Sequence, residues 1–247
     1  MHVALVLLAA LVGVPVGGFL NVVIDRVPDR HPLRGPRDGE AVPPVAWGPI
    51  PAQPWLLRPA GRAAGPRRWL WVELATAAVL GALAAAIGPD LRVVPLLVLG
   101  AALVAVSVID LQLLRIPDRV TFPTLAITLP LVVAVSAARD ELGAVSGAVV
   151  GSVAYFVALL VPHLVYPRGM GFGDVKLALL MGLHLGWLGW TEEHPIGGPI
   201  QQVLYALMLG CLLGAVFGIA AQLITKRRGE FPFGPALAVG CLVVLVT

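Results

Sequence analysis

The amino-acid sequence predicts an all-α integral membrane protein, a polytopic bundle of about eight transmembrane helices with both termini outside. Of its 247 residues, 58% are hydrophobic and 13% are charged. The mean hydropathy of +0.91 lies outside the range of soluble globular domains. The net charge of +3 is explained by basic loops on one side of a bilayer, so we expect no nucleic-acid partner.

Eight apolar stretches are long enough to cross a hydrocarbon core. They cover residues 3–24, 69–88, 93–110, 120–138, 142–163, 174–190, 203–225 and 231–247. Pro15, Gly17 and Gly18 interrupt the first stretch, which membrane helices tolerate. No Lys or Arg precedes this stretch, and it is longer than a signal-peptide core. We therefore expect a retained span, with a cleaved signal peptide as the alternative.

The distribution of basic residues predicts the orientation. Segments 25–68, 111–119, 164–176 and 226–230 fall on one side of an eight-span chain, and they hold fifteen of the seventeen Lys and Arg residues. Only Arg92 and Arg139 remain for the other side. Because positive charges favour the cytoplasmic side, these four segments are predicted to be cytoplasmic.

The one sizeable polar segment, residues 25–68, holds ten of the 22 prolines and eight arginines. Prolines at this density exclude a long helix. We therefore divide the chain into a first transmembrane helix (1–24), a cytoplasmic Pro/Arg-rich segment (25–68) and a seven-helix membrane core (69–247).

Two aspartates are the best candidates for chemistry. Asp110 ends one predicted span and Asp174 begins another, so both are expected at the cytoplasmic interface, where Gly171 and Gly173 allow close approach of a substrate backbone or another helix. An ionisable residue at a membrane span marks a functional site by default. Two carboxylates that share a proton form an acid/base pair that can activate water.

Each aspartate also has a purely structural interpretation. Asp174 could cap its helix, and Asp110 could pair loosely with Arg115. Asp118, which follows a proline and precedes an apolar run, is interpreted as a helix cap. Glu73 is expected to pair with Arg67 or Arg68 or to help shape the site.

The remaining histidines and cysteines are expected to be packed side chains and not metal ligands or catalytic groups. His163 and His184 are lone histidines in apolar surroundings, where packing and hydrogen bonding are expected. Cys211 and Cys241 fall in apolar runs and indicate neither a disulfide framework nor a metal site. We expect no metal, because no His, Cys and carboxylate cluster has ligand spacing.

Four runs resemble the type IV prepilin peptidases. They are the run from Asp110 to Asp118 (Asp-Leu-Gln-Leu-Leu-Arg-Ile-Pro-Asp), the run from Gly169 to Lys176 (Gly-Met-Gly-Phe-Gly-Asp-Val-Lys), the run from Phe231 to Pro235 (Phe-Pro-Phe-Gly-Pro), and residues 18–28. The resemblance extends along most of the chain. Its Gly-x-Gly-Asp motif also marks the presenilin-like intramembrane aspartic proteases.

The resemblance implies a membrane aspartic endopeptidase that removes the short basic leader of type IV prepilins and pseudopilins. It implies that Asp110 and Asp174 are catalytic, with Gly171, Gly173 and Lys176 shaping the site. Many members of that family also methylate the new N-terminus with S-adenosylmethionine. Many carry two Cys-x-x-Cys pairs in the first cytoplasmic segment, whereas residues 25–68 contain no cysteine. Zinc is therefore not expected, and methylation is left open.

The expected location is the bacterial inner membrane, with the active site facing the cytoplasm and with the prepilin and the lipid bilayer as partners. Lys176 and Arg168 could orient an acidic residue after the cleavage point, or they could serve only the charge asymmetry of the loops. Two other functions stay open. A transporter would use the carboxylates as an ion relay, and an inactive scaffold for pilin assembly would keep the fold without chemistry.

Overall fold

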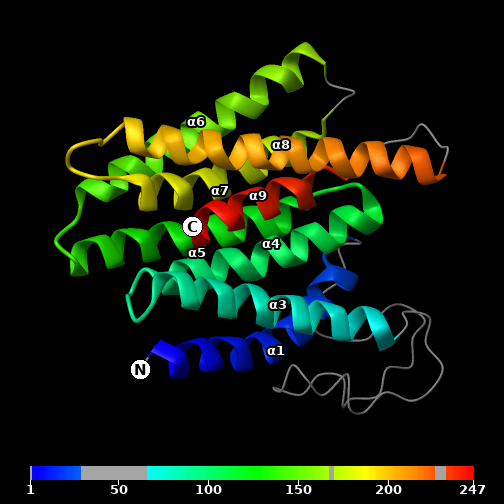
Figure 1. Cartoon of the computed structure of the whole chain (residues 1–247), viewed down its shortest axis with the longest axis horizontal. Helices are drawn as coiled ribbons and strands as arrows, with labels where there is room; N and C mark the ends of the chain where they lie inside the picture. The colour runs from blue at the N-terminus through cyan, green and yellow to red at the C-terminus, as the bar shows by residue number, and fades with distance from the viewer. Residues whose placement is uncertain (1, 29–65, 167–169, 226–231) are drawn as a thin grey trace.

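The computed structural model describes residues 2–28, 66–166, 170–225 and 232–247 (Figure 1). Within this part the chain forms helices and no strand. The eight helices are α1 (His2–Arg26), α3 (Pro66–Ile87), α4 (Val93–Leu113), α5 (Asp118–Ala138), α6 (Gly143–Val165), α7 (Phe172–Gly189), α8 (Gly197–Thr225) and α9 (Gly234–Val246). The predicted all-α bundle of eight helices is confirmed.

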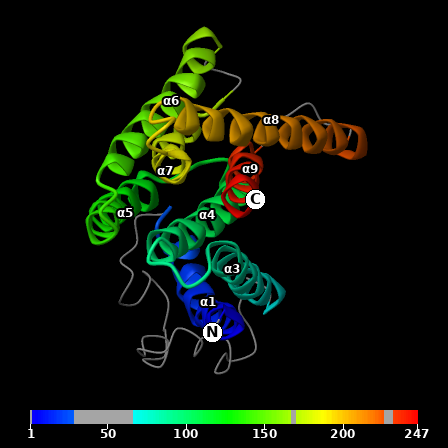
Figure 2. The ribbon, with the colours of Figure 1, turned by 60° about the vertical axis from the view of Figure 1, so that its left-hand side comes forward.

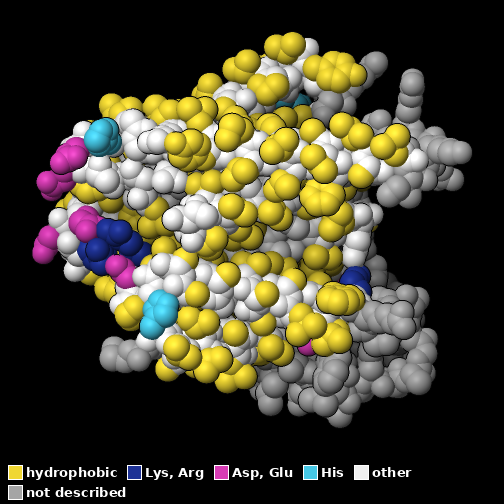
Figure 3. All heavy atoms as spheres, viewed as in Figure 1, with side chains coloured by type: hydrophobic (Ala, Val, Ile, Leu, Met, Phe, Trp, Pro, Cys, Tyr) yellow, Lys and Arg dark blue, Asp and Glu magenta, His cyan; other side chains and the backbone are white. Residues whose placement is uncertain are grey.

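Six of these helices are long and apolar enough to cross a membrane, namely α1, α3, α4, α5, α6 and α8. Helix α7 has 18 residues and α9 has 13. Figure 3 shows hydrophobic side chains over the length of the bundle, with one cluster of charged side chains at its left-hand end and a few more towards its right-hand end. This is the surface of a multi-pass membrane protein. The outward orientation of the termini stays a prediction, as do the three proposed segments of the chain.

The core of the bundle lies around α4 and α7. Helix α4 packs against α1, α3, α5, α7 and α9, and Figure 2 shows it between the α1–α3 pair and the later helices. Most residues of both α4 and α7 are buried. A helix that is apolar on every side is suited to such a central position. These two central helices carry Asp110 and Asp174.

Helices α6 and α7 form a tightly packed antiparallel hairpin. A Cβ atom at Gly151 would lie 2.4 Å from the carbonyl oxygen of Gly182, and one at Gly182 would lie 2.4 Å from that of Gly151. The Ser152 hydroxyl also donates a hydrogen bond to the Leu179 carbonyl at 2.9 Å. Small residues allow helix backbones to approach closely within a membrane, and this contact fixes the register of α7.

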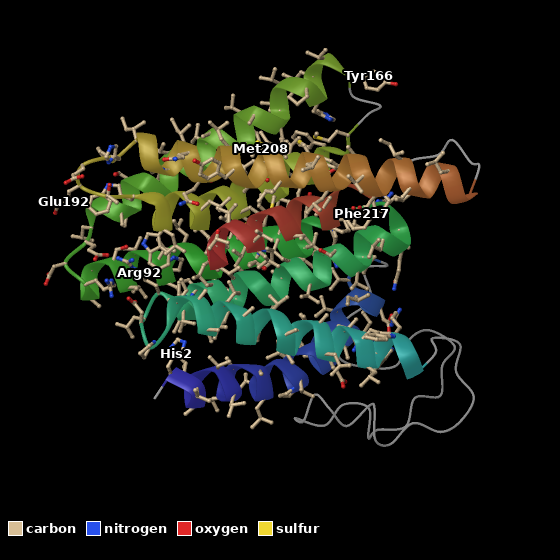
Figure 4. All side chains as sticks on the ribbon, in the orientation of Figure 1. His2, Arg92, Tyr166, Glu192, Met208 and Phe217 are labelled. Atoms are coloured by element: carbon tan, nitrogen blue, oxygen red, sulfur yellow. The ribbon has the colours of Figure 1, made fainter. Side chains whose placement is uncertain are left out.

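An ion-pair network joins two loops at one end of the bundle. Arg139 pairs with Asp90 at 2.7 Å and with Glu141 at 3.2 Å, and Arg92 also pairs with Glu141. In Figure 4 Arg92 and Glu192 lie at this end, while Tyr166 lies at the other. The network therefore ties the α3–α4 connection to the α5–α6 connection at the end opposite the α6–α7 connection.

Candidate active site

Asp110 lies in the last turn of α4 and is buried, with 6% of its surface exposed. The helix continues to Leu113, three residues beyond the predicted boundary, and Leu114 ends it in a left-handed conformation with φ of 51°. Asp110 therefore lies inside the helix. Its side chain projects from a helical turn whose position is fixed by the packing of α4.

The carboxylate of Asp110 accepts a hydrogen bond from the start of α9. The backbone N–H of Gly234 donates to Oδ2 at 3.0 Å. A Cβ atom at Gly234 would lie 2.9 Å from the same oxygen, so this position favours glycine. The hydrogen-bond donor to Asp110 is thus a backbone amide from far along the chain, and not the side chain of Arg115.

Asp174 lies in the first turn of α7 and is equally buried, at 6% exposed. The helix begins at Phe172, two residues earlier than predicted, and Gly171 occupies the N-cap position. The interpretation of Asp174 as the capping residue is therefore wrong. Its Oδ1 has no hydrogen-bond partner among the described residues, and a Cβ at Gly171 would lie 3.4 Å from Oδ2.

Ile116 connects the surroundings of the two aspartates. A Cβ atom at Gly173 would lie 2.8 Å from the Ile116 Cβ, and one at Gly234 would lie 3.2 Å from the Ile116 Cδ1. One isoleucine therefore contacts both the residue before Asp174 and the residue that binds Asp110. The two carboxyl groups therefore lie on either side of Ile116, close enough for the negative charge of one to oppose ionisation of the other. The structure brings together the two aspartates that the sequence singled out.

The two glycines of the motif serve different needs. Gly171 has extended backbone angles of −68° and 142° and precedes the helix. Gly173 is needed for a close approach, because the side chain of Ile116 occupies the space where its Cβ would point. The group that approaches Gly173 is thus the connection between α4 and α5, whereas a substrate backbone or another helix was predicted there.

Lys176, one turn after Phe172 in α7, is held by three neighbours. Its Nζ donates to both carboxylate oxygens of Asp118 at 2.8 and 2.9 Å. It also lies 5.1 Å from the ring centre of Phe172 and 5.8 Å from that of Phe122. Lys176 therefore links the start of α7 to the start of α5. Arg168 lies outside the described residues.

The interpretation of Asp118 as a helix cap is wrong. The N-cap of α5 is Pro117, with extended backbone angles of −78° and 128°, and the cap position makes no side-chain hydrogen bond. The proline sets the start of the helix and places Asp118 in its first turn. There the carboxylate pairs with Lys176, and its charge suits the positive end of the helix.

Glu73 is buried where α1 and α3 meet. A Cβ at Gly17 would lie 2.5 Å from the Cα of Glu73, and Oε1 of Glu73 has no hydrogen-bond partner in the described part of the chain. The expected partner Arg68 pairs instead with Asp25 at 2.5 Å. The side chain of Arg67 lies outside the described residues.

The two histidines are packed and hydrogen-bonded, as predicted. Nδ1 of His184 lies 2.9 Å from the Leu180 carbonyl oxygen. Nδ1 of His163 lies 2.9 Å from the Met170 carbonyl oxygen, and its ring lies 5.3 Å from that of Phe172. The sequence did not indicate that His163 contacts the motif around Asp174, since a lone histidine at the end of an apolar run carries no such signal.

Among the described residues, no group of three or more His, Cys, Asp and Glu side chains could hold a metal ion. The chemistry available at the site is that of two carboxyl groups. A buried carboxyl pair with one shared proton can take a proton from water and stabilise the charge on a carbonyl oxygen.

A multi-pass helical bundle with two buried aspartates on helices in contact fits the class of membrane aspartic peptidases. Comparison with known proteins agrees: the model of the type IV leader peptidase family matches residues 97–219. The chain belongs to this family. The predicted resemblance is confirmed.

Curated relatives named prepilin leader peptidase/N-methyltransferase match along most of the chain. The protein of this name from Aeromonas hydrophila is 31% identical over 100% of this chain and 91% of its own length. The one from Pseudomonas aeruginosa is 29% identical over 98% and 90%, respectively. The one from Myxococcus xanthus is 34% identical over 89% and 64%. No solved structure matches the chain.

Proposed function

We propose that this membrane peptidase removes the short basic leader from type IV prepilins or pseudopilins, with Asp110 and Asp174 as its catalytic residues. The observation that carries this proposal is the meeting of two buried, interacting carboxyl groups from α4 and α7. The family to which the chain belongs and the names of its relatives support the choice of substrate.

The proposed reaction is hydrolysis without a covalent enzyme intermediate. The ionised carboxylate takes a proton from water while the water oxygen bonds to the carbonyl carbon of the scissile peptide. The protonated carboxyl group donates to the carbonyl oxygen, where negative charge develops. When the C–N bond breaks, the nitrogen receives a proton, so the leader leaves with a carboxylate and the pilin with a free amine.

The position of the site suits such a substrate. A prepilin has a short basic leader followed by an apolar helix, so its cleavage point lies where the cytoplasm meets the membrane. Asp110 is in the last turn of α4 and Asp174 in the first turn of α7. In the proposed topology this end of the bundle faces the cytoplasm of a bacterial inner membrane, with both termini outside.

Cleavage is tested by co-expression with a prepilin and a mass measurement of the pilin N-terminus. Asp110→Asn and Asp174→Asn should each lower the cleavage rate by at least about 100-fold, because each removes one half of the acid/base pair. The matched control is Asp140→Asn, at a loop residue with φ of 56°, a conformation that Asn readily adopts. Unchanged cleavage by both the Asp110→Asn and the Asp174→Asn variant would contradict the proposal.

The same spectrum tests N-methylation, which the relatives' names include and for which S-adenosylmethionine would supply the methyl group. We assign no described residue to binding this compound. A trimmed pilin that carries the mass of an added methyl group would show that the second activity is present.

The transporter alternative is less well supported. Its carboxylates would be expected near the bilayer midplane, on helices related by an internal repeat, whereas Asp110 and Asp174 lie in terminal turns of their helices.

The scaffold alternative predicts that the prepilin is bound but not cleaved. The mass measurement distinguishes an uncleaved prepilin from a trimmed pilin.

A further inference from the structure

Residues 232–235, the described part of the run that begins at Phe231, take no part in the proposed hydrolysis, yet the structure connects them to Asp110. Gly234 is the first residue of α9, and its N–H donates to the Asp110 Oδ2 at 3.0 Å. The first N–H groups of a helix have no acceptor within the helix. In α9 one of them is directed at this carboxylate, while Pro235, which follows, has no N–H to leave unpaired.

This contact favours the charged form of Asp110. Asp110 sits at the C-terminal end of its own helix, where the exposed carbonyls disfavour a negative charge. The N-terminus of α9 supplies the opposite field and a donor at hydrogen-bonding distance. A backbone N–H can only donate, so the oxygen it contacts must act as an acceptor.

Asp174 has a different environment. Its Oδ1 is buried and has no hydrogen-bond partner in the described part of the chain. The backbone N–H groups of Gly171 and Asp174 at the start of α7 also favour a charge on this carboxyl group, but a buried carboxylate oxygen without a donor disfavours ionisation. A neutral carboxyl group needs fewer donors. Two neighbouring carboxyl groups do not both ionise readily, so a single proton is best placed on the oxygen that lacks a donor.

We propose that Asp110 is the ionised member of the pair and takes the proton from water, and that Asp174 carries the proton and donates to the substrate carbonyl. Gly234 is a positioning residue that keeps Asp110 charged. This assignment rests on the proposed peptidase function. It gives residues 232–235 a physical role, namely to direct the start of α9 at one carboxylate.

Other charged or titratable groups lie on the elements packed around the pair. They are the Lys176–Asp118 ion pair of α7 and α5, the Asp25–Arg68 ion pair of α1 and α3, Glu73 of α3, and Tyr155 of α6, which interacts electrostatically with Asp174. These groups are unchanged in the Gly234 variants, so differences between those variants report on the Gly234 contact.

A chemical label tests the assignment on the unmodified protein. The purified enzyme in detergent at neutral pH is treated with a small apolar epoxide, 1,2-epoxybutane. An epoxide carbon is attacked by a carboxylate anion, which forms an ester, and the opened oxygen takes a proton from water. Peptide mapping by mass should place the ester on Asp110, with loss of prepilin cleavage. An ester on Asp174 with Asp110 unlabelled would overturn the assignment.

Two substitutions at Gly234 test the role of the N–H. Gly234→Ala and Gly234→Pro both add a Cβ at the same position, but only Gly234→Pro removes the donor, and proline is tolerated at the first position of a helix. Proline also disfavours the αR conformation of the residue before it, which Phe233 adopts with φ of −86° and ψ of −26°. Thermal unfolding therefore has to show that Gly234→Pro is folded, and if it is not, the epoxide label alone decides the assignment. Compared with Gly234→Ala, Gly234→Pro should move the acid limb of the kcat/KM profile to higher pH by about one unit. The role given to Gly234 would be contradicted if the acid limbs of the two kcat/KM profiles fell at the same pH, or if only the alkaline limb shifted.

The controls separate this inference from the proposed function. Thermal unfolding in detergent shows whether each variant is folded, and Gly197→Ala, at a site with no atom within 4 Å of the added Cβ, reports the effect of a neutral substitution. If the wild-type protein does not cleave a prepilin, the proposed function fails. If the wild-type protein cleaves a prepilin and the Asp110→Asn and Asp174→Asn variants do not, the proposed function stands. The Gly234 variants and the epoxide label then decide whether Asp110 is the ionised residue and Asp174 the protonated one.

Discussion

Lys176 and Asp118 form a two-oxygen ion pair that joins the motif around Asp174 to the run that begins at Asp110. The Lys176 Nζ lies 2.8 and 2.9 Å from the two carboxylate oxygens. The two residues are far apart in the chain, and each follows a candidate catalytic aspartate. The pair therefore holds the start of α7 against the start of α5.

Breaking this pair should affect cleavage more than stability. Lys176→Met should lower kcat by roughly tenfold through misplacement of Asp174, while the stability of the fold changes by less than about 1 kcal/mol, because Asp118 is 52% exposed and the pair is screened by solvent. A double-mutant cycle with Asp118→Asn provides the measurement. Since both variants remove one interaction, the double variant should be no slower than Lys176→Met. Fully additive losses would mean that the ion pair has no role in positioning.

His163 should support the motif through its ring Nδ1. The Met170 carbonyl oxygen can only accept, so Nδ1 must carry the hydrogen of the 2.9 Å contact. His163→Leu should lower kcat about fivefold with KM unchanged, the size expected for one lost hydrogen bond. His163→Asn, whose amide nitrogen can take the place of Nδ1, should recover most of the rate. His194→Leu, in the loop before α8, is the matched control, and equal losses in the Leu and Asn variants would argue against the hydrogen bond.

The ion-pair network at the opposite end should make stability depend on pH. The hydrogen bond from Arg139, followed by the contact with Arg92, lowers the pKa of Glu141 below its ordinary value. Because the pKa is lower in the folded than in the unfolded protein, this contribution to the free energy of unfolding is present above about pH 4.3, the usual Glu value. It is lost as the pH falls through the lower folded pKa.

The check is thermal unfolding in detergent between pH 6 and pH 3. Glu141→Gln should remove part of the pH dependence and cost less than about 1 kcal/mol at pH 6, since the paired side chains are about 30% exposed. Glu192→Gln, at a residue exposed at the same end of the bundle, should follow the wild-type curve. A Glu141→Gln curve parallel to the wild type would refute the link between the network and pH.

The α6–α7 hairpin should not accept a methyl group at its centre. In Gly182→Ala the new Cβ would lie 2.4 Å from the Gly151 carbonyl oxygen, so the helices must separate. We expect a loss of about 1 to 3 kcal/mol in unfolding free energy, together with reduced cleavage as α7 shifts. Gly197→Ala is the control, and a Gly182→Ala protein with wild-type unfolding temperature would show that the helices are less tightly packed than described.

The sequence by itself determined the helices of this protein and its two most informative residues. Span length and apolar composition act locally, because each membrane helix satisfies its own backbone hydrogen bonds. All eight helices could therefore be predicted, with boundaries that differ by up to six residues. Asp110 and Asp174 could be selected because ionisable residues at the ends of apolar helices are rare enough to notice.

Only the tertiary structure decided what surrounds these aspartates. The Gly234 N–H on Asp110, Ile116 between the two motif regions, Lys176 on Asp118 and His163 at Met170 all depend on how separate helices pack. Asp118 shows the limit well, since its sequence context suggested a cap while a lysine 58 residues away supplied its partner. Helix formation is governed by neighbouring residues, whereas hydrogen bonds between helices are fixed by the packing of the whole bundle.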